Sequence, residues 1–279
     1  MKKELLIFTF SIVLLFQGCR DEVVPPPESS GVVYKEIVSV EIPGTINIKL
    51  YTTGYDSLTL GYNDIFMKVW ENSNEQNSGY VKLFPKMWMT PTYMHSTAIS
   101  ERFNYDNLIG YYKGYCVFNM VTDPPSVVWY GVFTFVDGGG ISYVQPDSTP
   151  MYTSYHPEKQ WRFFLDTTDQ LIYMLSLVKP FKPDVGLNDI TVLLHKTNGL
   201  LLTHEELHDA FMSVSVYNVD NFSQSTGNIS PVIGSDGFYN GKINIPYPGN
   251  WKFCDTIRYQ GRVITNRPPP MPEFYFEVP

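Results

Sequence analysis

The sequence predicts an all-β protein made of two tandem antiparallel β-sandwich domains, and three observations lead to this prediction. A Gly-x-Asn-Asp turn followed by an apolar stretch occurs at residues 61–70 and returns at residues 186–195. Apolar and polar residues alternate along many short segments, which is the period of half-buried strands. The chain also holds 20 Tyr, 18 Phe, 21 Pro and 20 Gly, a composition that favours short strands joined by turns.

The first copy of the repeat divides into strands separated by turn and loop residues. Its opening segment alternates apolar and polar residues in two runs, and Pro85 is expected to end the third strand because proline has no N–H to give to a sheet. The strands that we predict for this copy are 34–50, 61–70, 80–84, 111–120 and 127–136.

The second copy repeats this order. Its opening strands are 161–165 and 171–178, and the strands that follow are 186–195, 211–219, 238–244 and 251–259. Trp251 takes the place of Trp129, and each of these tryptophans is expected to fill the space between two sheets. About seven short strands in roughly 115–125 residues is close to the size of an immunoglobulin-like sandwich, so we expect two such domains.

These patterns divide the chain into five parts. The segment between the two copies is rich in Pro and hydroxyl residues, which indicates a linker. We predict a lipoprotein signal peptide at 1–18, a tether at 19–32, a first sandwich at 33–142, a linker at 143–157 and a second sandwich at 158–279.

The N-terminus predicts export to the bacterial envelope. Lys2 and Lys3 precede an apolar run at 5–16, which is shorter than the ~20 residues needed to cross a bilayer and suits a signal peptide. The layout resembles a bacterial lipoprotein signal, which implies that Cys19 is acylated and holds the mature chain on the outer membrane. The charged residues 20–22 are similar to the surface-export tag of Bacteroidetes lipoproteins, which implies exposure at the cell surface.

The composition limits the classes of partner. Hydrophobic residues make up 43% of the chain and charged residues 17%, so a packed core is expected. The formal net charge is −8, which argues against nucleic acid because phosphate binding requires a basic face. We therefore expect the membrane and other envelope proteins to be the partners.

Each copy resembles the YtkA-like domains of bacterial envelope proteins. The resemblance is carried by the Gly-x-Asn-Asp turn with its strand, by the Met- and His-bearing loop 87–95, and by an aromatic-x-Gly-x strand followed by a Trp strand. It covers most of 34–140 and 160–265. It implies a small β-sandwich related to periplasmic copper carriers, and it implies little about activity.

The loop 87–95 is the first candidate for a chemical site. It contains Met87, Met89, Met94 and His95, and the resemblance implies that these four residues bind a metal ion. Thioether sulfur prefers Cu(I), and imidazole is compatible with such a site, so copper would be the cofactor. The corresponding stretch of the second copy has no Met and no His, and the alternative is that these side chains fill gaps in the core.

The second candidate is the sequence from His204 to His208, which satisfies the pattern His-Glu-x-x-His. On a helix, both histidines would ligate zinc and Glu205 would act as general base. Thr203 and Glu206 could cap a short helix near 204–211. A third zinc ligand is missing at the usual positions, so the alternative is a structural helix between two strands.

These observations predict a non-catalytic, lipid-anchored envelope protein that acts as a binding or structural module, with an accessory role in an outer-membrane assembly. Soft-metal binding through the Met/His loop is the first alternative, and zinc hydrolysis is the second. Cys116 and Cys254 are expected to be buried free thiols, although a disulfide between them is open to an exported protein.

Overall fold

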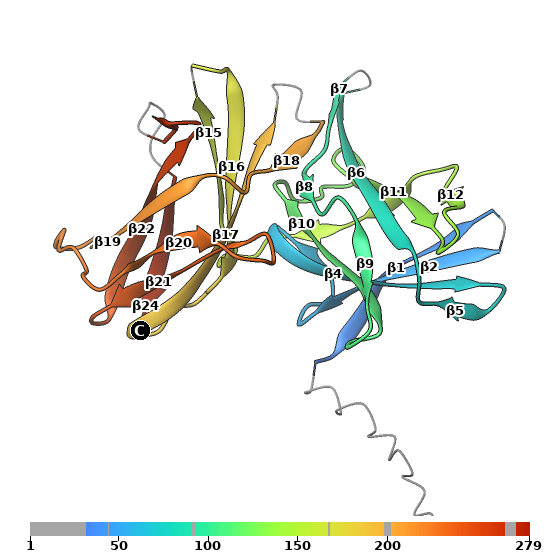
Figure 1. The fold of residues 1–279 in the computed structure, drawn as a ribbon, viewed down its shortest axis with the longest axis horizontal. Helices are drawn as coiled ribbons and strands as arrows, with labels where there is room; N and C mark the ends of the chain where they lie inside the picture. The colour runs from blue at the N-terminus through green and yellow to red at the C-terminus, as the bar shows by residue number, and fades with distance from the viewer. Residues whose placement is uncertain (1–31, 44, 91–92, 167, 198–201, 266–271) are drawn as a thin grey trace, which may run out of the picture. The chain divides into compact units, whose positions relative to one another are not determined.

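The computed structural model describes residues 32–43, 45–90, 93–166, 168–197, 202–265 and 272–279, and the chain from Val32 to Pro279 forms one compact unit. The predicted signal peptide, most of the predicted tether and Cys19 lie outside the described residues. The described residues form β-strands and no helix (Figure 1), so the all-β prediction is confirmed. Among them, therefore, no apolar helix of membrane-spanning length occurs.

The N-terminal half is a 12-stranded sheet with the order β1-β2-β4-β10-β9-β6-β11-β12, to which β5, β7, β8 and β13 add at the sides. The sheet folds back over one apolar core, because buried residues from both ends of this order belong to the same cluster. Its strands are β1 (Tyr34–Ile42), β2 (Ile46–Thr53), β4 (Gly61–Glu71), β5 (Asn74–Gln76), β6 (Tyr80–Thr90), β7 (Tyr93–His95), β8 (Ala98–Ile99), β9 (Phe103–Asp106), β10 (Tyr111–Phe118), β11 (Trp129–Val136), β12 (Ser142–Val144) and β13 (Thr149–Met151).

The C-terminal half is a sandwich of two sheets. One sheet has the order β15-β16-β17-β21-β20 with β18 beside β17, and the other has the order β19-β22-β23 with β24 also beside β22. Both sheets contribute buried residues to a second core. Its strands are β15 (Trp161–Asp166), β16 (Leu171–Lys179), β17 (Gly186–Thr197), β18 (His204–Glu206), β19 (Phe211–Asn218), β20 (Ile229–Ile233), β21 (Tyr239–Ile245), β22 (Gly249–Tyr259), β23 (Arg262–Val263) and β24 (Glu273–Val278).

The strand order of both halves is that of an immunoglobulin-like domain. In the constant-type fold, the first, second, fifth and fourth strands form one sheet, and the third, sixth and seventh form the other. The sets β16-β17-β21-β20 and β19-β22-β24 follow this order, and so do β2-β4-β10-β9 and β6-β11-β12. In the N-terminal half β9 pairs with both β10 and β6, which joins the two sheets into one.

The repeat seen in the sequence corresponds to equivalent strands. The copies of the Gly-x-Asn-Asp segment are β4 and β17, the central strands of their halves. Trp129 on β11 and Trp251 on β22 are both fully buried. Each indole N–H donates to a backbone carbonyl at 3.0 Å, so the polar atom of each ring is satisfied inside the core, as a buried tryptophan requires.

The asparagine of each copy closes the turn before the central strand by the same hydrogen bonds. Asn63 donates to the carbonyls of Thr59 and Gly61, at 2.7 and 2.8 Å, and accepts from the Thr59 N–H. Asn188 makes the corresponding three bonds with Asp184 and Gly186. Both glycines have positive φ, +75° and +110°, which favours glycine at this position.

Two predicted boundaries differ from the structure. Strand β6 continues through Pro85 to Thr90, so residues 87–90 are part of a strand rather than a loop. Along one edge of β6, the partner strand changes from β9 at Val81 to β7 at Met87. Pro85, which has no N–H, is tolerated between them because no described strand pairs with that edge there, and Ser96 Oγ donates to its carbonyl at 2.6 Å.

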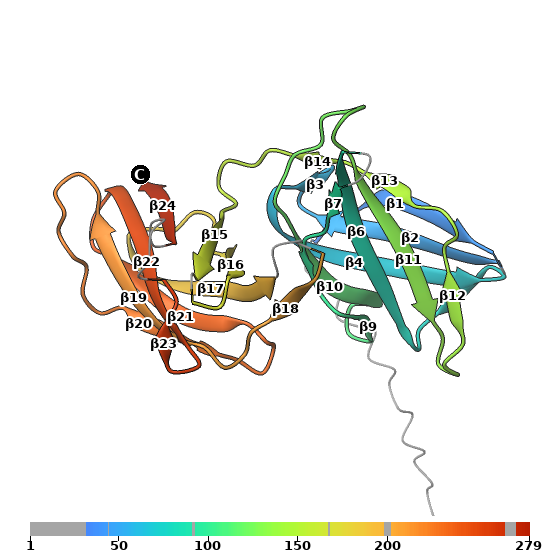
Figure 2. The same cartoon turned by 90° about the horizontal axis from the view of Figure 1, so that it is seen from above.

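The predicted linker 143–157 also differs. Strands β12 and β13 pair with β11, and β14 (Thr153–Ser154) pairs in parallel with β3 (Leu58–Thr59) (Figure 2). Lys159 then follows as a buried residue whose ammonium donates to Thr59 Oγ1 at 2.6 Å and lies over the Tyr55 ring. Most of the segment is therefore a structural part of the N-terminal half.

Asp255 departs from the pattern of the core. It lies opposite Val214 on the inward face of β22, between the core residues Phe253 and Ile257. In the first copy, Phe133 occupies the position four residues after the tryptophan. The Asp255 side chain is fully buried, and within the described part of the chain neither carboxyl oxygen has a hydrogen-bond partner. Burial raises the pKa of Asp255 from 3.8 to about 8.

This burial predicts a pH-dependent stability. Because the pKa of Asp255 is higher in the folded chain than in the unfolded chain, the free energy of unfolding falls as pH rises from about 4 to about 8 and then levels off. Asp255→Asn removes the titration, so its stability relative to the natural chain should increase by about 1.4 kcal/mol per pH unit across that window. Urea denaturation at several pH values measures this difference.

Asp189→Asn is the matched control, because the pKa of Asp189 is lowered by its hydrogen bond and ion pair with Lys242. This substitution should lower the stability at neutral pH. A stability difference for Asp255→Asn that stays constant with pH would contradict the prediction.

Candidate functional site

The candidate site lies where the N-terminal and C-terminal halves meet. A third apolar cluster joins them, with Tyr62, Ala98, Tyr115 and Val117 from the first half and Met174 and Leu193 from the second. Beside this cluster is a cavity of about 1000 Å³, which we call the seam cavity. Its lining includes residues from β4, β9 and β10 on one side and from β16, β17 and β21 on the other, so neither half forms it alone.

Three aromatic rings form one wall of the seam cavity. Tyr115 on β10 pairs with Asp64 on β4, which places Tyr62 at the diagonal position on the same face, within reach of an aromatic ring. The rings of Tyr62 and Tyr115 are stacked with centroids 5.7 Å apart. Phe238 meets both rings edge-on, at 6.2 and 5.9 Å. The ring of Phe238 comes from the second half, so the wall is shared.

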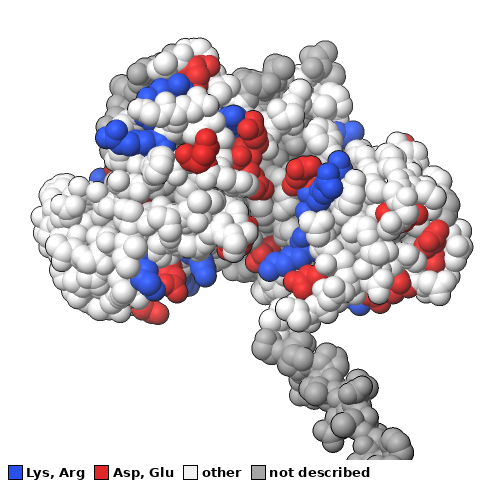
Figure 3. Space-filling model, viewed as in Figure 1, with Lys and Arg blue, Asp and Glu red and all other residues white. Residues whose placement is uncertain are grey.

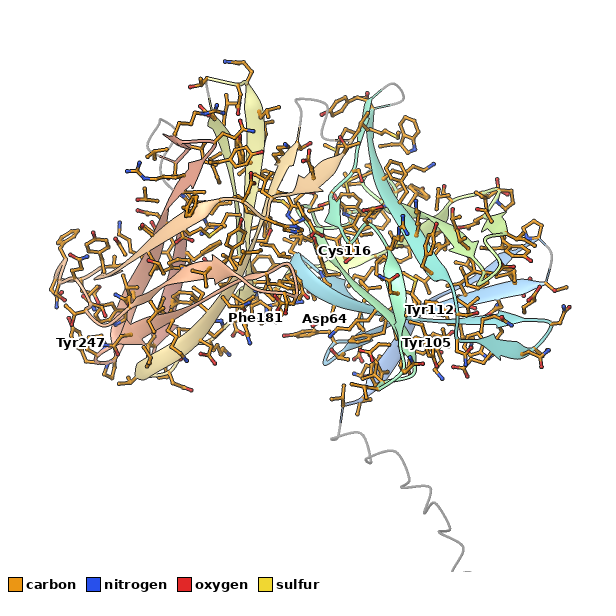
Figure 4. The ribbon with its side chains drawn as sticks, in the orientation of Figure 1. Asp64, Tyr105, Tyr112, Cys116, Phe181 and Tyr247 are labelled. Carbon is orange, nitrogen blue, oxygen red and sulfur yellow. The ribbon has the colours of Figure 1, made fainter. Side chains whose placement is uncertain are left out.

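Carboxylates stand beside this wall and are fixed by hydrogen bonds. Asp64 accepts from the Tyr62 hydroxyl at 2.9 Å, and Glu206 accepts from the Tyr115 hydroxyl. Asp236 accepts from the Phe238 N–H at 3.1 Å. These bonds orient the carboxylates, one of which, Asp64, is labelled in Figure 4 together with Tyr105. The face drawn in Figure 3 carries charged side chains of both signs among a larger uncharged area.

A hydrogen-bond chain crosses from one half to the other. The Tyr115 hydroxyl donates to Glu206, so the His195 Nε2 that lies 2.9 Å from the same hydroxyl acts as the donor to its oxygen. His208 Nε2 meets the second oxygen of Glu206 at 2.9 Å. His195 is fully buried on β17. This chain satisfies polar groups that the contact between the halves removes from water.

The surroundings of the site keep two of its imidazoles and two of its phenols neutral near pH 7. Burial, followed by the neighbouring His204 and His208, lowers the pKa of His195 from 6.5 to about 3. Burial and the nearby His95 lower the pKa of His204 to about 4. Burial raises the pKa values of Tyr62 and Tyr115 well above 10. Near neutral pH the imidazoles of His195 and His204 and the two phenols therefore act as fixed dipoles.

The predicted helix at 204–211 is wrong, because His204–Glu206 is strand β18 and pairs with β17. Side chains alternate along a strand, so Glu205 turns to Lys196, with which it forms an ion pair at 3.1 Å. Glu206 turns to Tyr115 instead. The arrangement of His204 and His208 on one helical face is not formed, and the zinc-hydrolase hypothesis loses its geometry. In the described residues, no group of three or more His, Cys, Asp or Glu could hold a metal ion.

The structure divides the predicted Met/His ligands between two faces of a hairpin. Met87 on β6 pairs with His95 on β7, and both are buried. Met94 pairs with Trp88 on the opposite face, and Met89 lies at a register shift with 40% of its surface exposed. His95 Nδ1 meets the Ser96 carbonyl at 3.0 Å, and its Nε2 has no hydrogen-bond partner within the described chain.

The two remaining cysteines fit the simpler expectation. Cys116 and Cys254 are both buried and free, so they are separate thiols. Burial raises the pKa of Cys116 well above 9 and that of Cys254 to about 12, which leaves both as unreactive thiols at neutral pH.

Sequence reasoning placed no site at Tyr62, Asp64, Tyr115 or Phe238, although these residues lie on strands that it predicted. The available signal was local: Tyr62 and Asp64 lie two residues apart, on one face of a strand that repeats. It did not show that the outer face of this strand meets the other half. Contact between residues far apart in sequence was needed to assemble the cavity.

Comparisons with known proteins add little to this description. No family model and no curated protein matches the chain. Among solved structures, it is similar to the Escherichia coli adhesin FdeC at 9% identity and a TM-score of 0.25, covering 88% of this chain and 62% of that chain. A chimeric titin Z1Z2 matches at 11% identity and a TM-score of 0.18, covering 80% and 89%. The chain thus spans less than two thirds of the adhesin chain's length, and likenesses this weak carry no functional argument.

The buried imidazoles predict sensitivity to acid. Because the pKa of His195 is lower in the folded chain than in the unfolded chain, stability is complete above pH 6.5 and falls as pH drops toward 3. His195→Gln keeps a donor for Tyr115 and removes the titration. Acidification lowers the free energy of unfolding of the natural chain through this titration. Below pH 6.5, the free energy of unfolding of the variant should therefore fall by about 1.4 kcal/mol per pH unit less than that of the natural chain.

Urea denaturation between about pH 7 and pH 4 measures this slope. His204→Gln should give a similar but narrower effect, since the pKa of His204 is lowered to about 4. Parallel stability curves for the natural chain and His195→Gln would show that the imidazole does not titrate as inferred.

Proposed function

We propose that this protein is a non-catalytic binding module of the bacterial envelope and that its ligand occupies the seam cavity. The observation that carries the proposal is the cavity of about 1000 Å³, walled by three aromatic rings and bordered by oriented carboxylates. Concave sites lined by aromatic side chains with a few placed polar groups are typical of ligand binding. The size lies at the upper end of the range of small-molecule sites, about 300–1,000 Å³.

The state of the lining groups supports binding over catalysis. Tyr62 and Tyr115 have pKa values well above 10, so neither phenol supplies an oxyanion nucleophile at neutral pH. His195 has a pKa of about 3 and uses its Nε2 as a donor, which makes it a poor general base. Glu206 already accepts two hydrogen bonds. Groups tied to one another in this way hold a ligand without transferring its protons.

We further propose that the module is held on the outer membrane by acylation of Cys19 and is exposed at the cell surface. The support is the resemblance of the N-terminus to lipoprotein signals and of both copies to YtkA-like envelope domains. An accessory role in an outer-membrane assembly requires a surface for a partner protein. Strands β6 and β7 offer such a surface through four side chains that are each 40–43% exposed: Phe84, Trp88, Met89 and Tyr93.

The ligand site is tested by thermal shift with separate sets of sugars, amines, organic acids and short peptides. A ligand of the seam cavity should raise the melting temperature of the natural chain by mass action and should not do so for Phe238→Ala. Phe211→Ala is the control, because Phe211 is 77% exposed and does not line the cavity. Hits that stabilise all three chains equally, or turnover of a bound compound, would contradict the proposal.

Bacterial cells that express the protein test the acyl anchor. Labelled palmitate should mark the natural chain and leave Cys19→Ala unmarked, and the variant should leave the membrane fraction. A natural chain that stays unlabelled would remove the proposed acyl anchor without touching the cavity.

Copper binding is a second candidate function, favoured by one observation. His95 Nδ1 is engaged with a backbone carbonyl, and its buried Nε2 is unpartnered within the described chain. His95 also pairs in register with Met87 on the neighbouring strand. A hydrogen bond at one ring nitrogen fixes the tautomer that leaves the other nitrogen free for a metal. Met87 and His95 are thus the two ligands that share a face of the hairpin, and Met94 lies on the opposite face.

A Cu(I) titration of the reduced protein separates this function from the first. The natural chain should bind Cu(I), and Met89→Ala/His95→Ala should lose it, because a soft thioether and an imidazole are removed together. His156→Ala, on a histidine outside the hairpin, should bind as the natural chain does. Absence of Cu(I) binding would eliminate the candidate, and retention after Met94→Ala would limit the ligand set to the inner face.

A further inference from the structure

We infer that the ligand of the seam cavity is a neutral oligosaccharide. This inference rests on the proposed function, because it names the chemical class that the same cavity would take. Three properties of the lining lead to it: the aromatic wall, the planar polar side chains around that wall, and the balance of charge.

The aromatic wall fits the apolar face of a sugar ring. Tyr62 and Tyr115 stack on each other and are each only 6% exposed, so they form the buried part of the wall. Phe238 and Tyr105 are partly exposed and also line the cavity. The C–H groups on one face of a pyranose pack on aromatic rings through dispersion and weak C–H contacts. An extended aliphatic chain would also be stabilised by burial against aromatic rings. The wall is bordered by carboxylates and amides, however, and an aliphatic chain cannot form hydrogen bonds with them.

The polar side chains around the wall match hydroxyl groups. Asn104 and Asn107 lie on the β9 side of the cavity, and across the described chain their carboxamides make no hydrogen bond with the protein. Asp64 and Asp236 are oriented by the hydrogen bonds already described. Carboxamides donate and accept, and carboxylates accept through two oxygens, so these planar groups can engage pairs of neighbouring hydroxyls, each of which also donates and accepts.

The charge balance disfavours anionic ligands. Five acidic and three basic residues line the cavity, a formal sum of −2, so phosphate, sulfate or carboxylate groups would meet net repulsion. The basic groups are partly engaged: Arg102 lies over the Tyr80 ring and beside Glu101, and Lys113 lies over the Phe66 ring. An organic amine would be attracted by this net charge but repelled locally by Arg102, Lys113 and Lys179. A neutral polyol meets neither effect.

Isothermal titration of the purified full chain with maltoheptaose, cellohexaose, laminarihexaose and xylohexaose tests the inference, with spermidine and polygalacturonate as ionic probes. At least one neutral oligosaccharide should bind. Phe238→Ala should weaken that binding roughly tenfold through loss of ring contact. Asn104→Ala, at an exposed position where folding is not at risk, should weaken it as well, while Phe211→Ala should leave it unchanged.

Spermidine or polygalacturonate binding that depends on Phe238, with no binding of the neutral sugars, would overturn the inference and leave the proposed function standing. Sugar binding that is equal in all variants would overturn it too. If no probe binds, and no compound in the thermal-shift sets stabilises the protein in a way that depends on Phe238, both this inference and the proposed function are overturned.

Discussion

The contact of Tyr115 with His195 is the interaction on which the site depends. The hydroxyl of one half and the imidazole of the other are both removed from water, and an unpaired buried polar group costs roughly 1–3 kcal/mol. Their hydrogen bond at 2.9 Å, continued to Glu206, satisfies the hydroxyl and the Nε2 of the imidazole, whose Nδ1 has no partner among the described residues. It also requires β18 to lie beside β17 so that Glu206 reaches the seam. The shared position of the aromatic wall follows from this arrangement.

The two copies use one framework in different ways. The outer face at the start of β4 carries Tyr62 and Asp64 and packs against the other half. The same place on β17 carries Leu187, which is 57% exposed, and Asp189, which pairs with Lys242. The duplicated turn and tryptophan preserve each fold, because their hydrogen bonds are local. The outer faces are free to diverge. The outer face of β4 is packed and lines the cavity, whereas the corresponding face of β17 is exposed.

The sequence was sufficient for the features set by local periodicity. The central strands, the equivalent tryptophans and the turn-closing Asn63 and Asn188 were all predictable, since a strand's alternation and a turn's side-chain bonds involve neighbours. The strand β18 was not, because a capping pattern at Thr203 competes with long-range pairing to β17. The short strands in the expected linker were missed for the same reason. The seam cavity is the extreme case: Tyr115 and His195 are 80 residues apart.

A cavity shared by two halves has an energetic consequence that a pocket inside one domain lacks. A ligand that touches both Phe238 and Tyr62 is bound only while the halves remain in contact, so its binding free energy adds to the stability of that contact by linkage. Residues that never touch the ligand, such as His195, then influence affinity by setting how often the halves are joined. Protonation of His195 at Nδ1 would place a charge in a fully buried site, so it disfavours the joined state and opposes ligand binding, and a bound ligand resists that protonation by the same free energy.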